Sequence, residues 1–294
     1  MKAAVSCRAK RYENVYSLHI RWENDDTDAE RDENSLRSII KLCGFPSPEV
    51  FLLKTAGSPG FELFDRIHNL QKQAFATNQT SLIIIHYAGH GITGEGDELV
   101  LATTNGRKRV RTGTIFHILT DESGYLDQSI VDVLLMLDCC YSYLAVRKFN
   151  PSSRIVEVII AGEARDPIAF AAGTRNSFTC KLHMESRSIQ QQSKEYAEVA
   201  EIIDVLNRKP SQKKPSHAVK LGVGSICLPL SAGYDHTCPS WPVDPPGNVL
   251  RPCSRYIYEG PAETSGRMIP WPRRGSTTNT RECQRNQLDD FHHR

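Results

Sequence analysis

Apolar residues follow two alternating spacings along residues 15–230 of this 294-residue chain. Runs of consecutive apolar and β-branched residues are typical of buried strands, and apolar residues three or four positions apart are typical of helices. The two clearest runs are SLIIIHYAGHG at residues 81–91 and DVLLMLDCC at residues 132–140. Because these runs lack polar alternation, they predict strands of a parallel sheet that is covered on both faces.

Further elements surround these two runs. Strands are expected at residues 15–22, 49–54, 154–162 and 225–228, with a hairpin near residues 99–110. Helices are expected from about residue 32 to a stop at Gly44, over residues 61–70, after a cap at Thr112 or Thr114, after a cap at Ser177, and over residues 195–206. Strands that alternate with helices predict an α/β fold, with a mainly parallel sheet sandwiched between helices and right-handed crossovers.

The composition changes after residue 230. Eight of the 16 prolines lie in residues 231–294, and a segment of this composition rarely buries a core. Candidate metal ligands in this segment are scattered without the paired spacing of a metal site; they include Cys238, Cys253, Cys283, His292 and His293. We therefore expect a folded domain at residues 1–230 and a Pro-rich, disordered tail at residues 231–294.

Charge and cysteine content narrow the classes of partner. The chain has 36 Lys and Arg against 34 Asp and Glu, a net charge of +2, which favours neither nucleic acid nor an anionic membrane as partner. No window approaches the ~18 apolar residues of a membrane span, and the first residues lack the apolar core of a signal peptide. Nine cysteines without a CxxC pair fit free thiols in a reducing compartment. We expect a cytoplasmic protein that needs no cofactor or metal.

The two clearest strands lead to residues of complementary chemistry. His90 lies in the glycine turn after the first strand, and Cys140 ends the second strand 50 residues later. A thiol with an ordinary pKa near 8.5 is mostly protonated at neutral pH, and a neighbouring imidazole can take its proton. This predicts His90 as general base and Cys140 as nucleophile, with the backbone amides of Gly91 and Cys140 as oxyanion donors. The alternative is that both residues only end core strands, since cysteine is among the most buried residue types.

The glycines around His90 permit a different interpretation. Gly89, Gly91 and Gly94 satisfy GxGxxG directly after a strand, as in dinucleotide-binding folds. That motif needs its third glycine to open a helix, yet residues 95–104 (EGDELVLATT) continue as extended, β-branched sequence. An acidic residue about 20 positions further on is missing as well. The sequence therefore favours a thiol site over a nucleotide site.

Longer motifs surround the histidine and the cysteine. HYAGHG (residues 86–91) followed by LDCCYS (residues 137–142) resembles the paired histidine and cysteine motifs of the caspase and metacaspase clan of cysteine peptidases. The resemblance covers about residues 15–230. Through WENDD (residues 22–26) and SFTCKL (residues 177–182), the chain is similar to the caspase-like proteins of filamentous fungi. The resemblance implies the caspase-hemoglobinase fold and a cysteine endopeptidase with His90 and Cys140 as its catalytic residues.

The same resemblance implies a substrate preference. Metacaspases prefer Arg or Lys before the scissile bond, and the acidic groups that they use match Asp32 and Asp138 here. A buried carboxylate pair would bind a cation; the alternative is an exposed helix-start Asp32 and a strand-end Asp138 whose hydrogen bonds are satisfied within the fold. Residues 94–98 (GEGDE) supply few acids for the calcium site of many metacaspases, so no metal is expected.

Two residues depart from the family pattern. Tyr141 stands where the cysteine motif has histidine, and Tyr143 stands where it has glycine. These rings could crowd the substrate channel. Two functions therefore follow from the sequence: an endopeptidase that acts on peptide or protein substrates, or a catalytically inactive caspase-like module that binds signalling partners through its tail.

Overall fold

The computed structural model describes residues 12–120, 131–146, 155–162, 169, 176–210, 213–222 and 224–230. All of these residues belong to one compact unit, Met1–Pro239. The expected tail at residues 231–294, with its cysteines and histidines, lies outside the described residues. The division into a folded domain and a tail therefore stays a prediction.

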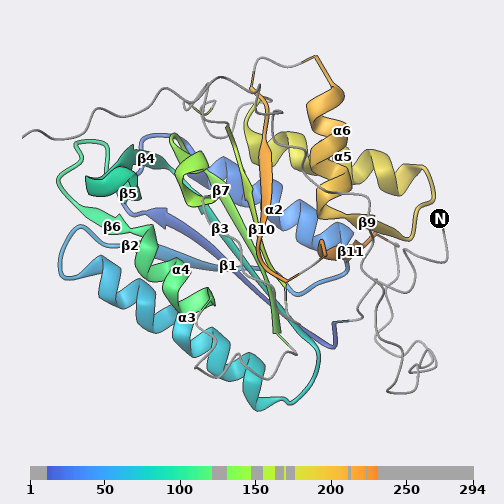
Figure 1. The fold of residues 1–294 in the computed structure, drawn as a ribbon, viewed down its shortest axis with the longest axis horizontal. Coiled ribbons are helices and arrows are strands. Elements are labelled where there is room, and N and C mark those ends of the chain that lie inside the picture. Colours follow the sequence, from blue (N-terminus) through green and yellow to red (C-terminus); the bar gives the residue numbers. More distant parts are fainter. Residues whose placement is uncertain are drawn as a thin grey trace, which may run out of the picture. The chain divides into compact units, whose positions relative to one another are not determined.

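A six-stranded sheet forms the centre of this unit (Figure 1). Its strand order is β10-β8-β7-β3-β1-β2. Neighbouring strands from β8 to β2 are parallel, and β10 pairs antiparallel with β8. Because β3, β7 and β8 are apolar along most of their length, they can be buried at every position. The strands are β1 (Asn14–Trp22), β2 (Glu49–Leu53), β3 (Ser81–Ala88), β7 (Val131–Asp138), β8 (Val156–Ile160) and β10 (Ser216–Leu221).

Helices cover both faces of this sheet (Figure 1). Successive residues of a strand point to opposite faces, so Leu82 and Ile84 of β3 pack under α2, α5 and α6. Ile83 and Ile85 pack on the other face, under α3 and α4. The predicted α/β class, a mainly parallel sheet between two helical layers, is confirmed. The helices are α2 (Ala29–Leu42), α3 (Pro59–Ala76), α4 (Thr112–Thr120), α5 (Phe178–Gln191) and α6 (Val199–Arg208).

Two predicted helix ends are confirmed and a third is not. Gly44 follows α2 at φ +70° and donates its N–H to the Lys41 carbonyl, as expected of a glycine stop. Ser177 caps α5, since its hydroxyl accepts the N–H of Cys180 at 3.2 Å. Thr112 is the first residue of α4 rather than its cap. Its hydroxyl donates to the Leu99 carbonyl at 2.8 Å and so joins the helix to a strand.

The two central strands end earlier than their apolar runs suggest. β3 ends at Ala88, and His90 already belongs to β4 (His90–Thr93) of a separate sheet with β5 (Leu99–Ala102) and β6 (Arg109–Arg111). Gly89 makes this change of direction at φ +142°, a conformation that side chains rarely adopt. β7 ends at Asp138, two residues before Cys140. Both candidate catalytic residues therefore lie beyond the strand ends of the central six-stranded sheet.

Short strands were harder to predict from the sequence. β10 (SHAVKL) is a half-exposed edge strand without an apolar run, and it was not expected. β9 (Tyr196–Glu198) pairs with β11 (Cys227–Pro229), so the helix expected from residue 195 begins only with α6. Such strands depend on their partners more than on their own residues.

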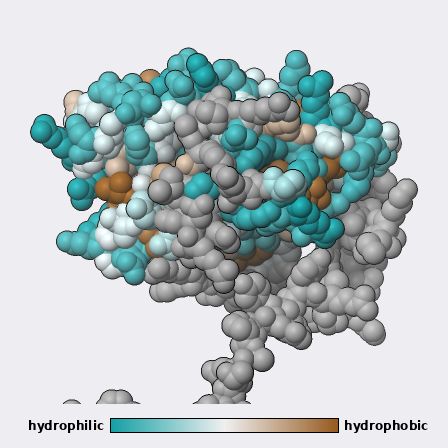
Figure 2. All heavy atoms as spheres, turned by 90° about the horizontal axis from the view of Figure 1, so that it is seen from above, coloured by the Kyte–Doolittle hydropathy of each residue, from teal (hydrophilic) through white to brown (hydrophobic). Residues whose placement is uncertain are grey.

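The described surface is mostly polar. Figure 2 shows one face of the molecule, where hydrophobic residues form small separate groups among hydrophilic ones. Large apolar side chains exposed in the described part are Leu52, Phe61 and Met184. They come from three different elements, and scattered apolar residues are normal on a protein surface. Among the described helices, none combines the length and apolarity that crossing a bilayer requires.

Candidate active site

The candidate site lies where β3 and β7 end side by side. The two strands are parallel neighbours, and their last residues, Ala88 and Asp138, are paired. The Gly89 N–H then donates to the Asp138 carbonyl at 3.3 Å. Because the carboxyl ends of parallel strands share one edge of the sheet, the segments that carry His90 and Cys140 leave the sheet at the same place.

Gly91 is in direct contact with the cysteine segment. A Cβ atom at residue 91 would lie 2.1 Å from the Cys140 carbonyl oxygen and 3.0 Å from Cys139 Sγ. Only a glycine allows the two backbones to approach this closely. The structure therefore brings the predicted residues 90, 91 and 140 together. Whether the Gly91 and Cys140 amides hold an oxyanion stays a prediction.

His90 is held from two sides. Its backbone carbonyl accepts the Tyr87 hydroxyl at 2.8 Å. Its Nε2 atom lies 2.6 Å from Asp26 Oδ1, and Thr104 donates its hydroxyl to that same oxygen at 2.6 Å. The imidazole is 36% exposed. Asp26 lies inside the quoted WENDD motif, but no sequence signal connects Thr104 to the site.

The two adjacent cysteines differ in their surroundings. Cys139 is 1% exposed, and burial raises the pKa of its thiol well above the usual value, with the charge of Asp138 adding to the effect. Cys140 is partly exposed. A buried thiol that stays protonated is a poor nucleophile, so the geometry favours Cys140.

Tyr141 and Tyr143 follow in a tight turn. Tyr141 has φ +57°, which is unusual for a residue with a bulky side chain, and a short 3₁₀ helix, Ser142–Val146, follows it. Both rings are partly buried and pack against the core beneath α3 and α4. Contacts with the core therefore fix part of the Tyr141 ring and part of the Tyr143 ring.

The two predicted substrate-binding acids are both buried. Asp32 in the first turn of α2 is 0% exposed and accepts the Ser177 hydroxyl at 2.8 Å. The alternative of an exposed helix-start Asp32 is therefore wrong, because Ser177 at the start of α5 covers this carboxylate. Asp138 Oδ2 accepts the N–H and the hydroxyl of Thr179 at 2.9 and 2.7 Å, so the alternative of an internally satisfied Asp138 holds for this oxygen.

Burial and the neighbouring acid change the protonation of Asp138. Burial first, and then the negative charge of Asp32, raise the pKa of Asp138 to about 7. Two carboxylates that repel each other in a buried site cannot both ionise freely. At neutral pH the pair therefore retains a proton for part of the time, and a cation could take its place.

A buried chain of hydrogen bonds connects Asp138 to the middle of the sheet. Thr179 Oγ1 lies 2.9 Å from His86 Nε2, and His86 Nδ1 lies 2.8 Å from His19 Nδ1. Because Thr179 gives its only hydroxyl proton to Asp138, its oxygen accepts from His86 Nε2–H, and His19 Nδ1–H then donates to His86. Burial lowers the pKa of His19 to about 3 and that of His86 well below its usual value. No motif in the sequence predicted these hydrogen bonds.

The His90 imidazole and the Cys140 thiol form no hydrogen bond in the described part of the chain. In enzymes without substrate such bonds are often long and tighten on binding. The arrangement can nevertheless support acyl transfer, because a base, a thiol and backbone amides gather at one sheet edge.

The dinucleotide interpretation does not fit the structure. Gly94 precedes the three-residue 3₁₀ helix Glu95–Asp97 and not an α-helix, so no extended helix N-terminus faces a pyrophosphate there. The described residues also contain no cluster of three or more His, Cys, Asp or Glu side chains suited to a metal ion.

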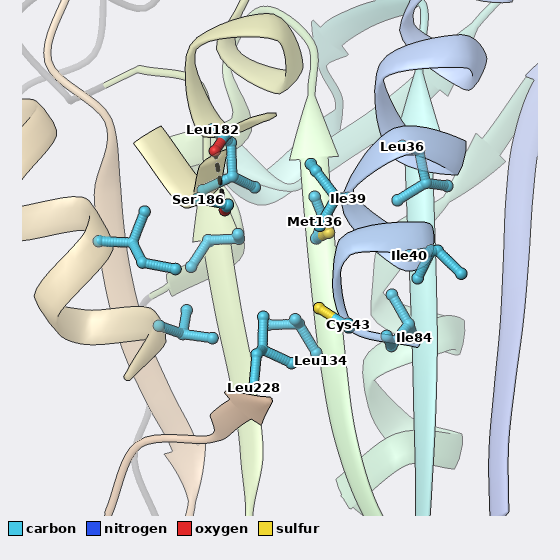
Figure 3. A pocket seen from close by; sticks show the side chains of 13 residues that line it. Leu36, Ile39, Ile40, Cys43, Ile84, Leu134, Met136, Leu182, Ser186 and Leu228 are labelled. Atoms are coloured by element: carbon cyan, nitrogen blue, oxygen red, sulfur yellow. Dashed lines mark hydrogen bonds between the residues drawn. The ribbon is translucent and has the colours of Figure 1, made fainter. Parts of the chain in front are cut away.

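One internal cavity lies away from the candidate site, between the sheet and the layer of α2, α5 and α6 (Figure 3). Its volume is about 10 Å³, room for about one water molecule. The lining is apolar apart from Ser186, whose hydroxyl donates to the Leu182 carbonyl at 2.9 Å. Cys43 also lines it, and burial raises the pKa of that thiol to about 12. This cavity is a packing defect rather than a ligand site.

Comparisons with known proteins find likeness in structure and not in sequence. No protein-family model and no curated protein sequence matches the chain. Among solved structures, 72 chains match. One of these is caspase-1 from Spodoptera frugiperda, with 11% sequence identity, a TM-score of 0.49, and coverage of 74% of this chain and 90% of that chain. At these values the likeness concerns the path of the chain and says nothing of activity.

Proposed function

We propose that this protein is a caspase-like cysteine endopeptidase that cuts peptide or protein substrates after Arg or Lys. The observation that carries the proposal is the packing of Gly91 against Cys140. This contact joins a turn that carries an imidazole to a segment that carries a partly exposed thiol. The caspase and metacaspase motifs at these positions support the same roles.

The chemistry that we propose is acyl transfer to the thiol. His90 takes the proton of Cys140, and the thiolate attacks the peptide carbonyl carbon. The amides of Gly91 and Cys140 stabilise the oxyanion of the tetrahedral intermediate. The C–N bond then breaks, and His90 gives its proton to the leaving amine. Water, activated by His90, hydrolyses the thioester and regenerates the thiol.

The buried acids support the preference for a basic side chain. Burial first, and then the negative charge of Asp32, raise the pKa of Asp138 to about 7. A guanidinium or ammonium group near the pair would replace the retained proton and relieve the repulsion between the carboxylates. We therefore expect Asp32→Asn and Asp138→Asn to raise KM for Arg and Lys substrates more than they lower kcat.

A catalytically inactive signalling module is the second candidate. Tyr141 and Tyr143 favour it, because they replace smaller or polar residues of the cysteine motif beside the thiol and adopt a tight turn there. In this case the tail would bind the partner. Both candidates imply a cytoplasmic protein without cofactor, nucleic acid or membrane partner, and the free thiols of Cys43, Cys139 and Cys140 support a reducing compartment.

Peptide cleavage by the full chain distinguishes the two candidates. The substrates are fluorogenic peptides with Arg, Lys or Asp before the scissile bond, and the variants are Cys140→Ala and its neighbour Cys139→Ala. An endopeptidase predicts cleavage after Arg or Lys that falls about 1,000-fold or more in Cys140→Ala and persists in Cys139→Ala. Absence of cleavage, or equal cleavage by wild type and Cys140→Ala, would contradict the proposal and favour the inactive module.

A further inference from the structure

The loop between β1 and α2 places a carboxylate on the ring of His90. Asp26 Oδ1 lies 2.6 Å from His90 Nε2. The same oxygen accepts the hydroxyl of Thr104, from the turn between β5 and β6, at 2.6 Å. These hydrogen bonds, from Thr104 first and then His90, lower the pKa of Asp26. Asp26 is therefore an ionised acceptor at neutral pH.

The other two aspartates of this loop have different contacts. Asp25 accepts the N–H and hydroxyl of Thr27 and the N–H of Ala29, so it supports the start of α2. Asp28 precedes α2 at φ +62° and lies 3.7 Å from Arg31. Among these three aspartates, Asp26 is the one whose side chain forms a hydrogen bond with His90. Its position is not a by-product of capping the helix.

The contact determines which nitrogen of His90 carries a proton. An ionised carboxylate only accepts hydrogen bonds, so Nε2 must be the protonated nitrogen of the neutral ring. Nδ1 is then unprotonated, and no group in the described part of the chain forms a hydrogen bond with it. This is the nitrogen that can take a proton from Cys140.

We propose that Asp26 is a positioning residue for His90, and that Thr104 holds Asp26 in place. Asp26 keeps the ring in the Nε2–H tautomer, and its negative charge stabilises the imidazolium that forms when the Cys140 proton moves to Nδ1. The site then has three members, Cys140, His90 and Asp26, and the carboxylate comes from a surface loop. This inference rests on the proposed peptidase function.

Exposure limits the size of the effect. Asp26 is 54% exposed and His90 36%, so water screens their interaction. In serine proteases with a buried triad aspartate, its replacement by asparagine lowers kcat about 10⁴-fold. For Asp26→Asn we expect a smaller loss of about 10- to 100-fold in kcat/KM, mostly in kcat.

The test uses full-length variants matched in charge. Asp26→Asn is compared with Asp28→Asn, which removes the same charge from the same loop without touching His90. Thr104→Val removes the hydroxyl that holds Asp26, and Thr104→Ser keeps it. We expect Asp28→Asn and Thr104→Ser to stay within about twofold of wild type and Thr104→Val to lose about three- to tenfold, since one supporting hydrogen bond is removed. Thermal melting checks that every variant folds.

Two further measurements do not depend on peptide cleavage. The ¹⁵N chemical shifts of His90 report its tautomer, and the rate of Cys140 alkylation by iodoacetamide reports how readily the thiol loses its proton. Wild type should show the Nε2–H tautomer, whereas Asp26→Asn should show a mixture and slower alkylation at pH 6–7. If no peptide is cut but these differences appear, the peptidase assignment fails and the positioning role stands.

Other outcomes overturn the positioning role. If peptides are cut and Asp26→Asn matches Asp28→Asn in rate, tautomer and alkylation, Asp26 does not position His90. If Asp26→Asn is faster than wild type, the carboxylate holds His90 away from Cys140 and is a brake.

Discussion

Cys139 and Cys140 are adjacent in the sequence, but their side chains differ in burial. Cys139 continues the alternation of β7 and points into the core beneath α3 and α4, where burial raises the pKa of its thiol. Cys140 lies beyond the strand and is partly exposed. We expect iodoacetamide at pH 7 to label Cys140 before Cys139 or Cys43, as read by peptide mass spectrometry. Equal labelling of the three would contradict this division.

Gly91 has no space for a side chain, because a Cβ atom there would lie 2.1 Å from the Cys140 carbonyl oxygen. We expect Gly91→Ala to lower kcat/KM about 100-fold, because the new methyl group would displace the Cys140 backbone, and to cost about 1–3 kcal/mol of unfolding free energy. Steady-state kinetics and urea denaturation measure the two effects.

The matched control for this substitution is Gly60→Ala in α3. A Cβ atom there meets Val110 at an ordinary 3.8 Å, so the variant should be as active as wild type and slightly more stable. A Gly91→Ala protein that behaves like Gly60→Ala would show that the contact between the two turns is not needed.

At the scale of elements, polar residues at the start of α5 form hydrogen bonds with α2, β7 and β3. Ser177 bonds Asp32 of α2, and Thr179 bonds both Asp138 of β7 and His86 of β3. Helix ends have free N–H groups, and here they face buried acids. The start of α5 therefore supplies hydrogen-bond partners to polar groups on three other elements.

Thr179→Val should destabilise the protein strongly. Valine has nearly the same shape, but it leaves Asp138 without a hydroxyl donor and His86 Nε2–H without an acceptor. Each unsatisfied buried group costs about 1–3 kcal/mol, so we expect a loss of about 2–4 kcal/mol in urea denaturation.

Ser186→Ala in the same helix is the comparison for Thr179→Val. Its hydroxyl bonds only the preceding turn at Leu182, and the loss should stay below about 1 kcal/mol. If both variants lose the same stability, the hydrogen-bond chain through Thr179 has no special role.

At the scale of the whole molecule, buried ionisable groups shape the pH dependence of stability in opposite directions. Asp138 keeps its proton in the folded state up to about pH 7, whereas the unfolded chain releases it near pH 4. Folding is therefore weakened as pH rises from about 4 to 7. His19 and His86 stay neutral when folded, whereas unfolded histidines take up protons below about pH 6.5, so folding is weakened as pH falls below that value.

Asp138→Asn should remove the loss of stability that accompanies a rise in pH from about 4 to 7. The amide oxygen can still accept from Thr179, but the side chain no longer ionises. We expect the variant to gain about 1–3 kcal/mol over wild type at pH 8 and to show little gain at pH 4, measured by urea denaturation across this range. Asp65→Asn, on the exposed side of α3, is the control, and a gain that does not depend on pH would refute the assignment to Asp138.

His19→Asn should reduce the loss of stability that accompanies a fall in pH below about 6.5. The asparagine amide can donate to His86 Nδ1 in place of the His19 ring and has no proton to take up. Below about pH 5.5 the variant should lose stability less steeply than wild type, by up to about 1.4 kcal/mol per pH unit. Urea midpoints from pH 7 to pH 4 measure this slope, and exposed His117→Asn should leave it unchanged. A slope equal to that of wild type would exclude His19 as the linked group.

Much of the fold could be predicted because the patterns that indicate it lie within short stretches of consecutive residues. The apolar runs of β3, β7 and β8 and the spacing of α2 and α3 lie in consecutive residues, as do the Gly44 and Ser177 helix ends. β10 and β9 could not be found in this way, since an exposed edge strand and a three-residue strand take their conformation from the strands that they pair with.

By itself, the sequence determined the order of the long helices and apolar strands, the α/β class, and the pair His90 and Cys140 as candidates, because short motifs and periodic spacing record these features residue by residue. Only the tertiary structure decided which groups meet around that pair. Asp26 reaches His90 across 64 positions, and Thr179 reaches His86 across 93. Such contacts depend on strand pairing and helix packing, which bring distant side chains together and bury them, and burial then decides which of them hold a proton.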